Sequence, residues 1–223
     1  MYFESTHVFC EPKFNIDSRI AEFYNTITSS FYLWAAVVGA TLTLGKSKKP
    51  NRYWTLCAAW ACLVAIGVGS AVFHARLTFE TQMCDEVSMI AFVVVLLVGK
   101  RECVGCGPHQ IHARSGVWAL SGATLLGALL YVATREYVVF VVTFTLAVVA
   151  EVTVSSLIRD FSTQKSRRCL KNATLLIALG GLVWGCESCF CKTHPWVWVL
   201  HSVWHALSAL SAYFAVMHVY RFK

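Results

Sequence analysis

The stretch GVGSAVFHARLTFETQMCDEVSMI places Ser70, His74 and Asp85 between two strongly apolar runs, where polar groups are costly unless they find partners. A second stretch, HSVWHALSALSAY, carries His201 and His205 four positions apart, which puts both imidazoles on one face of a helix. Three neutral imidazoles with a fourth position open describe a hydrolytic zinc site. A carboxylate beside such a metal can orient a ligand or act as a general base. These residue types therefore predict metal-assisted hydrolysis.

The elements that would position these groups are membrane-spanning segments. The chain is 57% hydrophobic and 14% charged, whereas a soluble domain carries about 25% charged residues. Its first residues lack the apolar core that a cleaved signal peptide needs, so we expect the apolar segments to be retained. Lipid tolerates only helices or closed barrels, and continuous rather than alternating apolarity favours helices. The sequence predicts an all-α integral membrane protein.

The number of helices follows from the length of the apolar windows. A helix rises 1.5 Å per residue, so about 20 apolar residues cross a hydrocarbon core of roughly 30 Å. No linker splits the chain, and we expect a single membrane domain over residues 1–223. The expected spans are approximately 22–44, 53–74, 82–98, 117–133, 137–158, 171–186 and 196–219. This is a seven-transmembrane-helix bundle.

Basic residues orient this bundle in the membrane. Of the 19 lysines and arginines, 14 fall in the first, third and fifth loops, at their edges, or in the C-terminal tail. By the positive-inside rule that side is cytosolic, so the N-terminus is luminal or extracellular and the C-terminus cytosolic. The candidate site residues then meet at the non-cytosolic leaflet. Topology accounts for the net charge of +7, which gives no reason to expect nucleic acid as a partner.

The convergence of these groups has other interpretations than a metal site. A hydrogen-bonded polar core without metal, or a binding site without chemistry, would also use them. Glu86 follows Asp85 directly but points about 100° away on a helix, so we expect a supporting or pore-lining group rather than the base. Glu151, inside the fifth span, has no assigned partner. Either a hydrogen bond within the bundle or a contact to a substrate head group would explain it.

Three segments, IAEFYNTITS and the two quoted above, resemble the alkaline ceramidase family. That family belongs to a superfamily of seven-helix membrane hydrolases and adiponectin-receptor-like proteins. The resemblance implies that zinc is held by His74, His201 and His205. It implies that Asp85 handles the proton of the attacking water and that Ser70 stabilises the oxyanion. The implied reaction cleaves ceramide, taken from the bilayer, to a free fatty acid and a sphingoid base.

The resemblance also implies a location and a set of partners. An endoplasmic reticulum or Golgi membrane is expected, with no readable feature that chooses between them. We expect a lipid substrate and no obligate protein partner. Two alternative functions stay open on the same scaffold. One is a receptor of the adiponectin-receptor-like class, and the other is a lipase-type remodeller of lipid anchors.

The resemblance also implies a calcium site, which members of the family build from an Asp-Trp-x-Glu-x-Asn run and a later glutamate. The corresponding stretch VFCEPKF keeps Glu11, and Glu22 stands at the later position, but Val8, Phe9 and Lys13 replace the aspartate, tryptophan and asparagine. Calcium prefers six to eight oxygens, so calcium is doubtful here. Three interpretations stay open: Lys13 bridges the two glutamates as a fixed cation, calcium is retained, or all three groups are solvated.

A disulfide is expected on the non-cytosolic side. The predicted topology places Cys10, Cys189 and Cys191 there, with Cys186 at the end of the sixth span. The resemblance to the family likewise points to a bridge from Cys10 to one of the other three. Such a bridge would hold the N-terminal segment over the loop between the sixth and seventh helices. The sequence does not choose among the three partners.

Overall fold

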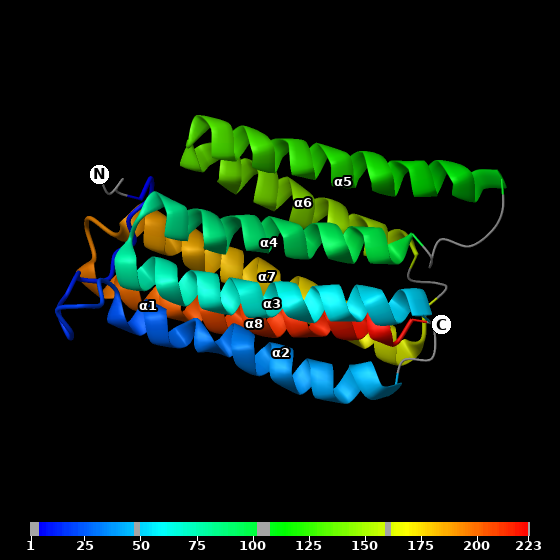
Figure 1. Cartoon of the computed structure of the whole chain (residues 1–223), viewed down its shortest axis with the longest axis horizontal. Coiled ribbons are helices and arrows are strands. Elements are labelled where there is room, and N and C mark those ends of the chain that lie inside the picture. The colour runs from blue at the N-terminus through cyan, green and yellow to red at the C-terminus, as the bar shows by residue number, and fades with distance from the viewer. Residues whose placement is uncertain (1–4, 47–49, 102–107, 159–161, 223) are drawn as a thin grey trace.

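The chain folds into a bundle of long helices, described by a computed structural model that covers residues 5–46, 50–101, 108–158 and 162–222. The α-helices are α1 (Phe23–Thr28), α2 (Ser30–Thr43), α3 (Pro50–Arg76), α4 (Phe79–Lys100), α5 (Pro108–Thr134), α6 (Tyr137–Leu157), α7 (Gln164–Phe190) and α8 (Val199–Tyr220) (Figure 1). Short 3-10 turns, Leu44–Lys46 and Pro195–Trp198, extend α2 and precede α8. Within the described residues, seven helical segments are long and apolar enough to cross a membrane. The predicted all-α seven-helix fold is confirmed.

Four helices, α3, α4, α5 and α7, extend beyond both ends of the apolar windows that predicted them, and α4 and α7 show why. The windows 82–98 and 171–186 lie inside α4 and α7, and the additional turns carry polar residues. Capping explains where these helices begin. Thr78 and Thr81 form a reciprocal capping box before α4, and the Thr163 hydroxyl accepts from the Ser166 backbone N–H before α7. A hydropathy window detects the lipid-crossing part of a helix and misses its polar ends.

The N-terminus and the C-terminus lie at opposite ends of the long axis of the bundle (Figure 1). Residues 47–49 and 159–161, which carry Lys48, Lys49 and Arg159 of the basic set used for the orientation, lie outside the described residues. Which end faces the cytosol therefore stays a prediction.

The outer surface of the bundle is apolar, as lipid contact requires. Large side chains such as Trp34, Leu126, Leu157 and Leu182 are more than 60% exposed. In water such a surface would mark aggregation or an interface, but against lipid chains it carries no such cost. The polar side chains turn inward: Ser70, His74, Asp85, Glu86, His201 and His205 are all buried. The fold is thus apolar outside and locally polar inside.

Candidate metal centre

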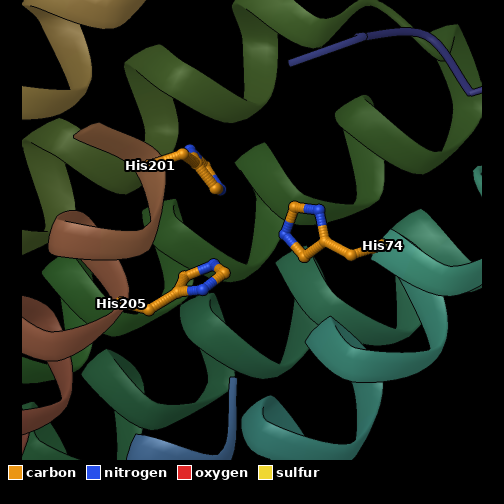
Figure 2. A group of neighbouring side chains, drawn as sticks. All are labelled: His74, His201 and His205. Carbon is orange, nitrogen blue, oxygen red and sulfur yellow. The ribbon is translucent and has the colours of Figure 1, made fainter. Parts of the chain in front are cut away.

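Three buried histidines meet between α3 and α8 near the N-terminal end of the bundle. His74 lies two residues before the end of α3, and His201 and His205 lie in the first two turns of α8. Their ring centroids are 5.1, 5.1 and 4.7 Å apart, and one ring nitrogen from each lies within 4.8 Å of the others. Figure 2 shows the three rings turned toward a common point. The predicted ligand set is therefore assembled in space and can hold a metal ion.

Each imidazole is oriented by a partner at Nδ1. His74 Nδ1 lies 2.5 Å from Glu22 Oε2, and His201 Nδ1 lies 3.0 Å from Glu187 Oε2. With both carboxylates ionised, each accepts from the Nδ1–H of its histidine, and both Nε2 atoms then keep a free lone pair. This arrangement is common among metal-ligating histidines, because the carboxylate fixes the ring and raises its basicity.

His205 follows the same rule through a hydroxyl group. Its Nδ1 lies 2.9 Å from Thr28 Oγ1, which itself donates to the Tyr24 carbonyl at 2.8 Å. Thr28 therefore accepts from His205, and a third Nε2 lone pair remains. Three neutral imidazole donors on one point fit zinc, with a fourth position open to water or substrate.

Glu22 links the metal centre to the N-terminal segment, which we define as residues 5–22. One carboxylate oxygen contacts His74 and accepts from Asn25 Nδ2 at 3.2 Å, and the other pairs with the Lys13 ammonium. Burial by itself raises the pKa of Glu22, but the hydrogen bond and charge of His74 and the charge of Lys13 outweigh it and lower the pKa to about 2. Glu22 is a fully buried carboxylate that stays ionised through these partners.

The N-terminal segment covers the histidines and is fastened to the end of α7 through Cys10. The ring of Phe9 lies over His201, with 3.8 Å between ring centroids. The Cys10 backbone N–H donates to Glu187 Oε1 at 3.0 Å, and Cys10 forms a disulfide with Cys191. The expected bridge is confirmed and its partner is Cys191. Cys186 and Cys189 have free thiols.

Ser70 and Asp85 lie beside the histidines because α3 and α4 approach closely. A Cβ atom on Gly69 would lie 2.7 Å from the Cys84 carbonyl oxygen, so only glycine permits this backbone contact. The contact brings the Ser70 hydroxyl to the Asp85 carboxylate. Both side chains line a cavity of about 380 Å³ together with His201 and His205. The structure thus gathers all five sequence-predicted groups.

Glu86 lines the same cavity but is held by two other groups. Its Oε1 accepts from Gln82 Nε2 at 3.0 Å, and its Oε2 accepts from the Tyr131 hydroxyl. Gln82 in turn accepts from the Thr6 backbone N–H at 2.8 Å, which ties α4 to the N-terminal segment. Both oxygens of Glu86 are thus engaged within the bundle, and its supporting role stays a prediction.

A second, larger cavity extends from this site into the bundle. It spans about 680 Å³, including space open to the outside of the bundle, and is lined mainly by apolar side chains of α4, α6, α7 and α8. It shares Tyr32, Met89 and Trp204 with the smaller cavity. Along α8 its lining residues run from Trp204 to His218, which is roughly 21 Å at 1.5 Å per residue. The polar site therefore opens onto a long apolar chamber.

In the suspected calcium region Glu11 and Glu22 are buried, and Lys13 is half-buried against them, so the three groups are not simply solvated. Lys13 contacts the Glu22 carboxylate and reaches Glu11 only through its backbone carbonyl, at 2.8 Å. The Glu11 carboxylate instead accepts from the backbone N–H groups of Tyr24 and Asn25, at 2.7 and 2.9 Å. Of the three open interpretations, the lysine bridge is closest to this arrangement, but Lys13 joins one carboxylate and two backbone carbonyls rather than two carboxylates.

Two positioning residues went unnoticed in the sequence. Glu187 sits near the end of a long apolar helix and is 1% exposed. A carboxylate at the same end of the bundle as the histidines was a usable signal, but the polar run CESCFC around it resembles a loop. Thr28 lies in the segment IAEFYNTITS that carries the family resemblance, but its residue type indicated no role, because threonines are common in apolar helices.

Comparison with known proteins agrees with this geometry. The model of the family described as Ceramidase matches residues 1–223. Alkaline ceramidase 3 of Mus musculus is 24% identical over 96% of this chain and 82% of its own length. Alkaline ceramidase YPC1 of Saccharomyces cerevisiae is 24% identical over 96% of this chain and 75% of its own length. An alkaline ceramidase of Arabidopsis thaliana is 23% identical over 95% of this chain and 81% of its own length.

Proposed function

Because the chain belongs to the alkaline ceramidase family, we propose that it hydrolyses the amide bond of ceramide within the membrane, releasing a fatty acid and a sphingoid base. The observation that carries the proposal is the meeting of His74, His201 and His205 beside Ser70 and Asp85, at the head of a long apolar cavity. An amide between two hydrocarbon chains matches a polar site that opens onto an apolar chamber.

The metal would be held by the Nε2 atoms of the three histidines. A bound zinc ion would supply Lewis acidity, polarising the amide carbonyl and lowering the pKa of water to about 7. Glu22, Glu187 and Thr28 keep the three rings in one orientation, so no ring has to reorganise during turnover.

Asp85 and Ser70 divide the remaining work at the amide. Asp85 accepts a proton from the attacking water as the new C–O bond forms, and returns it to the nitrogen as the C–N bond breaks. Return of the proton is needed because an unprotonated amine leaves poorly. The Ser70 hydroxyl lies 3.0 Å from the Ser29 hydroxyl, and Ser70 can donate its own hydrogen to the carbonyl oxygen as negative charge develops there.

The larger cavity would take one hydrocarbon chain of the substrate. Its lining along α8 is built from small residues, Ser208, Ser211, Ala212 and Ala215, which leave room beside the helix. A chain in this chamber exchanges lipid contacts for protein contacts, so it costs little to move the substrate from the bilayer into the site.

We further propose an endoplasmic reticulum or Golgi location for this integral, multi-pass membrane protein. The Cys10–Cys191 disulfide supports exposure of the histidine end to an oxidising compartment, and the lumen of the secretory pathway is one. Together with the excess of basic loops at the other end, this favours a luminal N-terminus. A membrane-impermeant label should not reach this end of the protein in sealed microsomes, and should reach it once the microsomes have been permeabilised.

The deciding experiment measures metal content and substrate cleavage on the same purified protein. Wild type should hold about one zinc per chain and release fatty acid from ceramide but not from phospholipid. His205→Ala should abolish both zinc retention and release. His194→Ala, which changes an exposed histidine at the same end of the bundle, serves as the control and should change neither.

Each other outcome redirects the assignment. Release of fatty acid from phospholipid alone would favour a lipase-type remodeller. Zinc retention and ligand binding without cleavage of either lipid would favour a receptor. Wild type without any transition metal would contradict the proposed hydrolase outright.

A further inference from the structure

The Lys13 ammonium group lies inside a cluster of oxygen atoms at the N-terminal end of the bundle. It donates to the Phe9 carbonyl at 2.7 Å, to the Glu11 carbonyl at 2.8 Å and to the Glu22 carboxylate. A lysine ammonium has three donors, and three acceptors are present. The side chain is 26% exposed, so the pair with the fully buried Glu22 is shielded from water on most sides. The site is saturated by the protein itself.

This oxygen cluster does not fit calcium. Calcium takes six to eight oxygens, and here a cation already uses the two carbonyls and one oxygen of Glu22. Both Glu11 carboxylate oxygens are committed to the backbone N–H groups of Tyr24 and Asn25. Val8, where the related pattern has an aspartate, supplies no side-chain oxygen and is 59% exposed. A divalent ion would have to displace the ammonium and would still lack ligands.

We propose that Lys13 is a built-in replacement for a divalent cation and that it acts as a positioning residue for the metal centre. Its ammonium fixes one oxygen of Glu22, and the other oxygen of the same carboxylate holds His74 Nδ1. The protein therefore needs no calcium to orient His74. The inference rests on the proposed function only in taking His74 as a zinc ligand.

The Cys10–Cys191 disulfide lies close to Lys13 in the chain and helps to hold its ammonium group in the place of a bound ion. Lys13 is three residues from Cys10, whose disulfide to Cys191 and hydrogen bond to Glu187 fasten the segment to α7. Lys13 also closes a loop on itself through the carbonyls of Phe9 and Glu11. One short segment thus supports both His74, through Lys13 and Glu22, and His201, through Cys10 and Glu187. A bound ion can leave when its concentration falls, whereas this ammonium cannot.

The first arm of the test asks whether the native protein responds to calcium. Purified zinc-loaded wild type is titrated with calcium chloride alone, by isothermal titration calorimetry and by thermal unfolding at constant zinc. No binding heat and no change in Tm are expected up to millimolar calcium. Stoichiometric binding with a rise in Tm would overturn the proposal, whatever the variants below do.

The second arm removes the ammonium. Lys13→Met keeps the length of the side chain but leaves Glu22 without its cation, and should weaken zinc affinity about 10- to 100-fold in a competition titration with a chromophoric chelator. Lys192→Met changes an exposed lysine at the same end and should bind zinc as wild type does. Unchanged zinc affinity in Lys13→Met would contradict the positioning role.

The third arm restores side-chain oxygens in place of the ammonium. The double variant Val8→Asp with Lys13→Asn should bind calcium, and calcium should raise its Tm and recover most of the zinc affinity. Failure of calcium to bind or to stabilise this variant would count against a cation position at this place. All readouts are metal affinity and Tm, so they stand even if ceramide proves not to be the substrate.

Discussion

Buried ionisable groups occur at both ends of this bundle, and the two sets are built differently. At the N-terminal end, each histidine is fixed through Nδ1 and the free nitrogens face one point. At the opposite end, the Lys100 ammonium pairs with the Glu151 carboxylate, which also accepts from Ser155 Oγ at 3.2 Å. The first set leaves coordinating capacity unused and the second consumes it.

The comparison shows that burial of a charge does not by itself mark a reactive site. Ionisable groups inside membranes are expensive and usually functional, and Glu151 met that criterion. Its partner Lys100 supplies a structural reason for its presence, although Glu151 also borders the far end of the larger cavity. What separates the histidine cluster from the Lys100–Glu151 pair is whether donors and acceptors satisfy one another or converge on a shared empty position.

Substitution of Asp85 should have the largest effect on the rate of ceramide cleavage, and it tests the contrast between the two ends of the bundle. Asp85→Asn should lower the rate of ceramide cleavage by about 10²- to 10⁴-fold, because proton transfer is lost while the histidines are untouched. Zinc content measured in parallel should stay at the wild-type level. Glu80→Gln, an exposed carboxylate in the first turn of the same helix, is the control. Full activity of Asp85→Asn would show that another group acts as the general base.

Substitution of Ser70 should have the second largest effect on catalysis. Ser70→Ala removes one hydrogen-bond donor to the developing oxyanion and should reduce kcat by about 10²- to 10³-fold, with little change in KM. Steady-state kinetics on a short-chain fluorescent ceramide can separate the two constants. Ser88→Ala, which removes a hydroxyl that donates to the Cys84 carbonyl at 2.6 Å, should leave both constants as in wild type. A rise in KM alone would assign Ser70 to binding.

Substitution of Glu187 tests whether a carboxylate that holds a metal-ligating histidine contributes to zinc affinity. Glu187→Gln keeps the shape but weakens the hold on His201 Nδ1, and should reduce zinc affinity about 10- to 100-fold. Competition with a chromophoric chelator measures this directly. Glu136→Gln, an exposed glutamate at the start of α6, is the matched substitution. Equal zinc affinity in the two variants would reduce Glu187 to an anchor for Cys10.

The opposite end should show the smallest effect on catalysis. Lys100→Met leaves Glu151 buried without its partner and should destabilise the protein by about 3–5 kcal/mol, measured by unfolding in detergent. The specific activity of the folded fraction should stay near wild type. Changing both residues, Lys100→Met with Glu151→Leu, should restore most of the stability. A loss of specific activity in this double variant would break the distinction between the two ends.

Much of the architecture was accessible from local features of the chain. The lengths of the apolar runs predict seven spans, because the bilayer fixes how many residues a helix needs. The four-residue spacing of His201 and His205 predicts one shared face. Counting the spans then puts His74 and Asp85 at the same end, since each helix reverses the direction of the chain.

Partners across the bundle were not accessible in this way. The sequence offered Cys186, Cys189 and Cys191 equally, and only the tertiary structure brings Cys191 to Cys10. It likewise joins Lys13 to a carbonyl of Glu11 rather than to its carboxylate, which is occupied by the start of α1. Such choices depend on the path of the loops and on competition between acceptors.

Amino-acid types and their spacing thus determined the membrane-spanning class, the number of helices and the end at which the chemistry gathers. These are properties of segments, set by hydrophobicity and helical period. The tertiary structure alone decided which groups hold the imidazoles, because hydrogen bonds between Glu22 and His74, or Glu187 and His201, join residues distant in the chain or on separate helices. Their geometry exists only once the helices have packed.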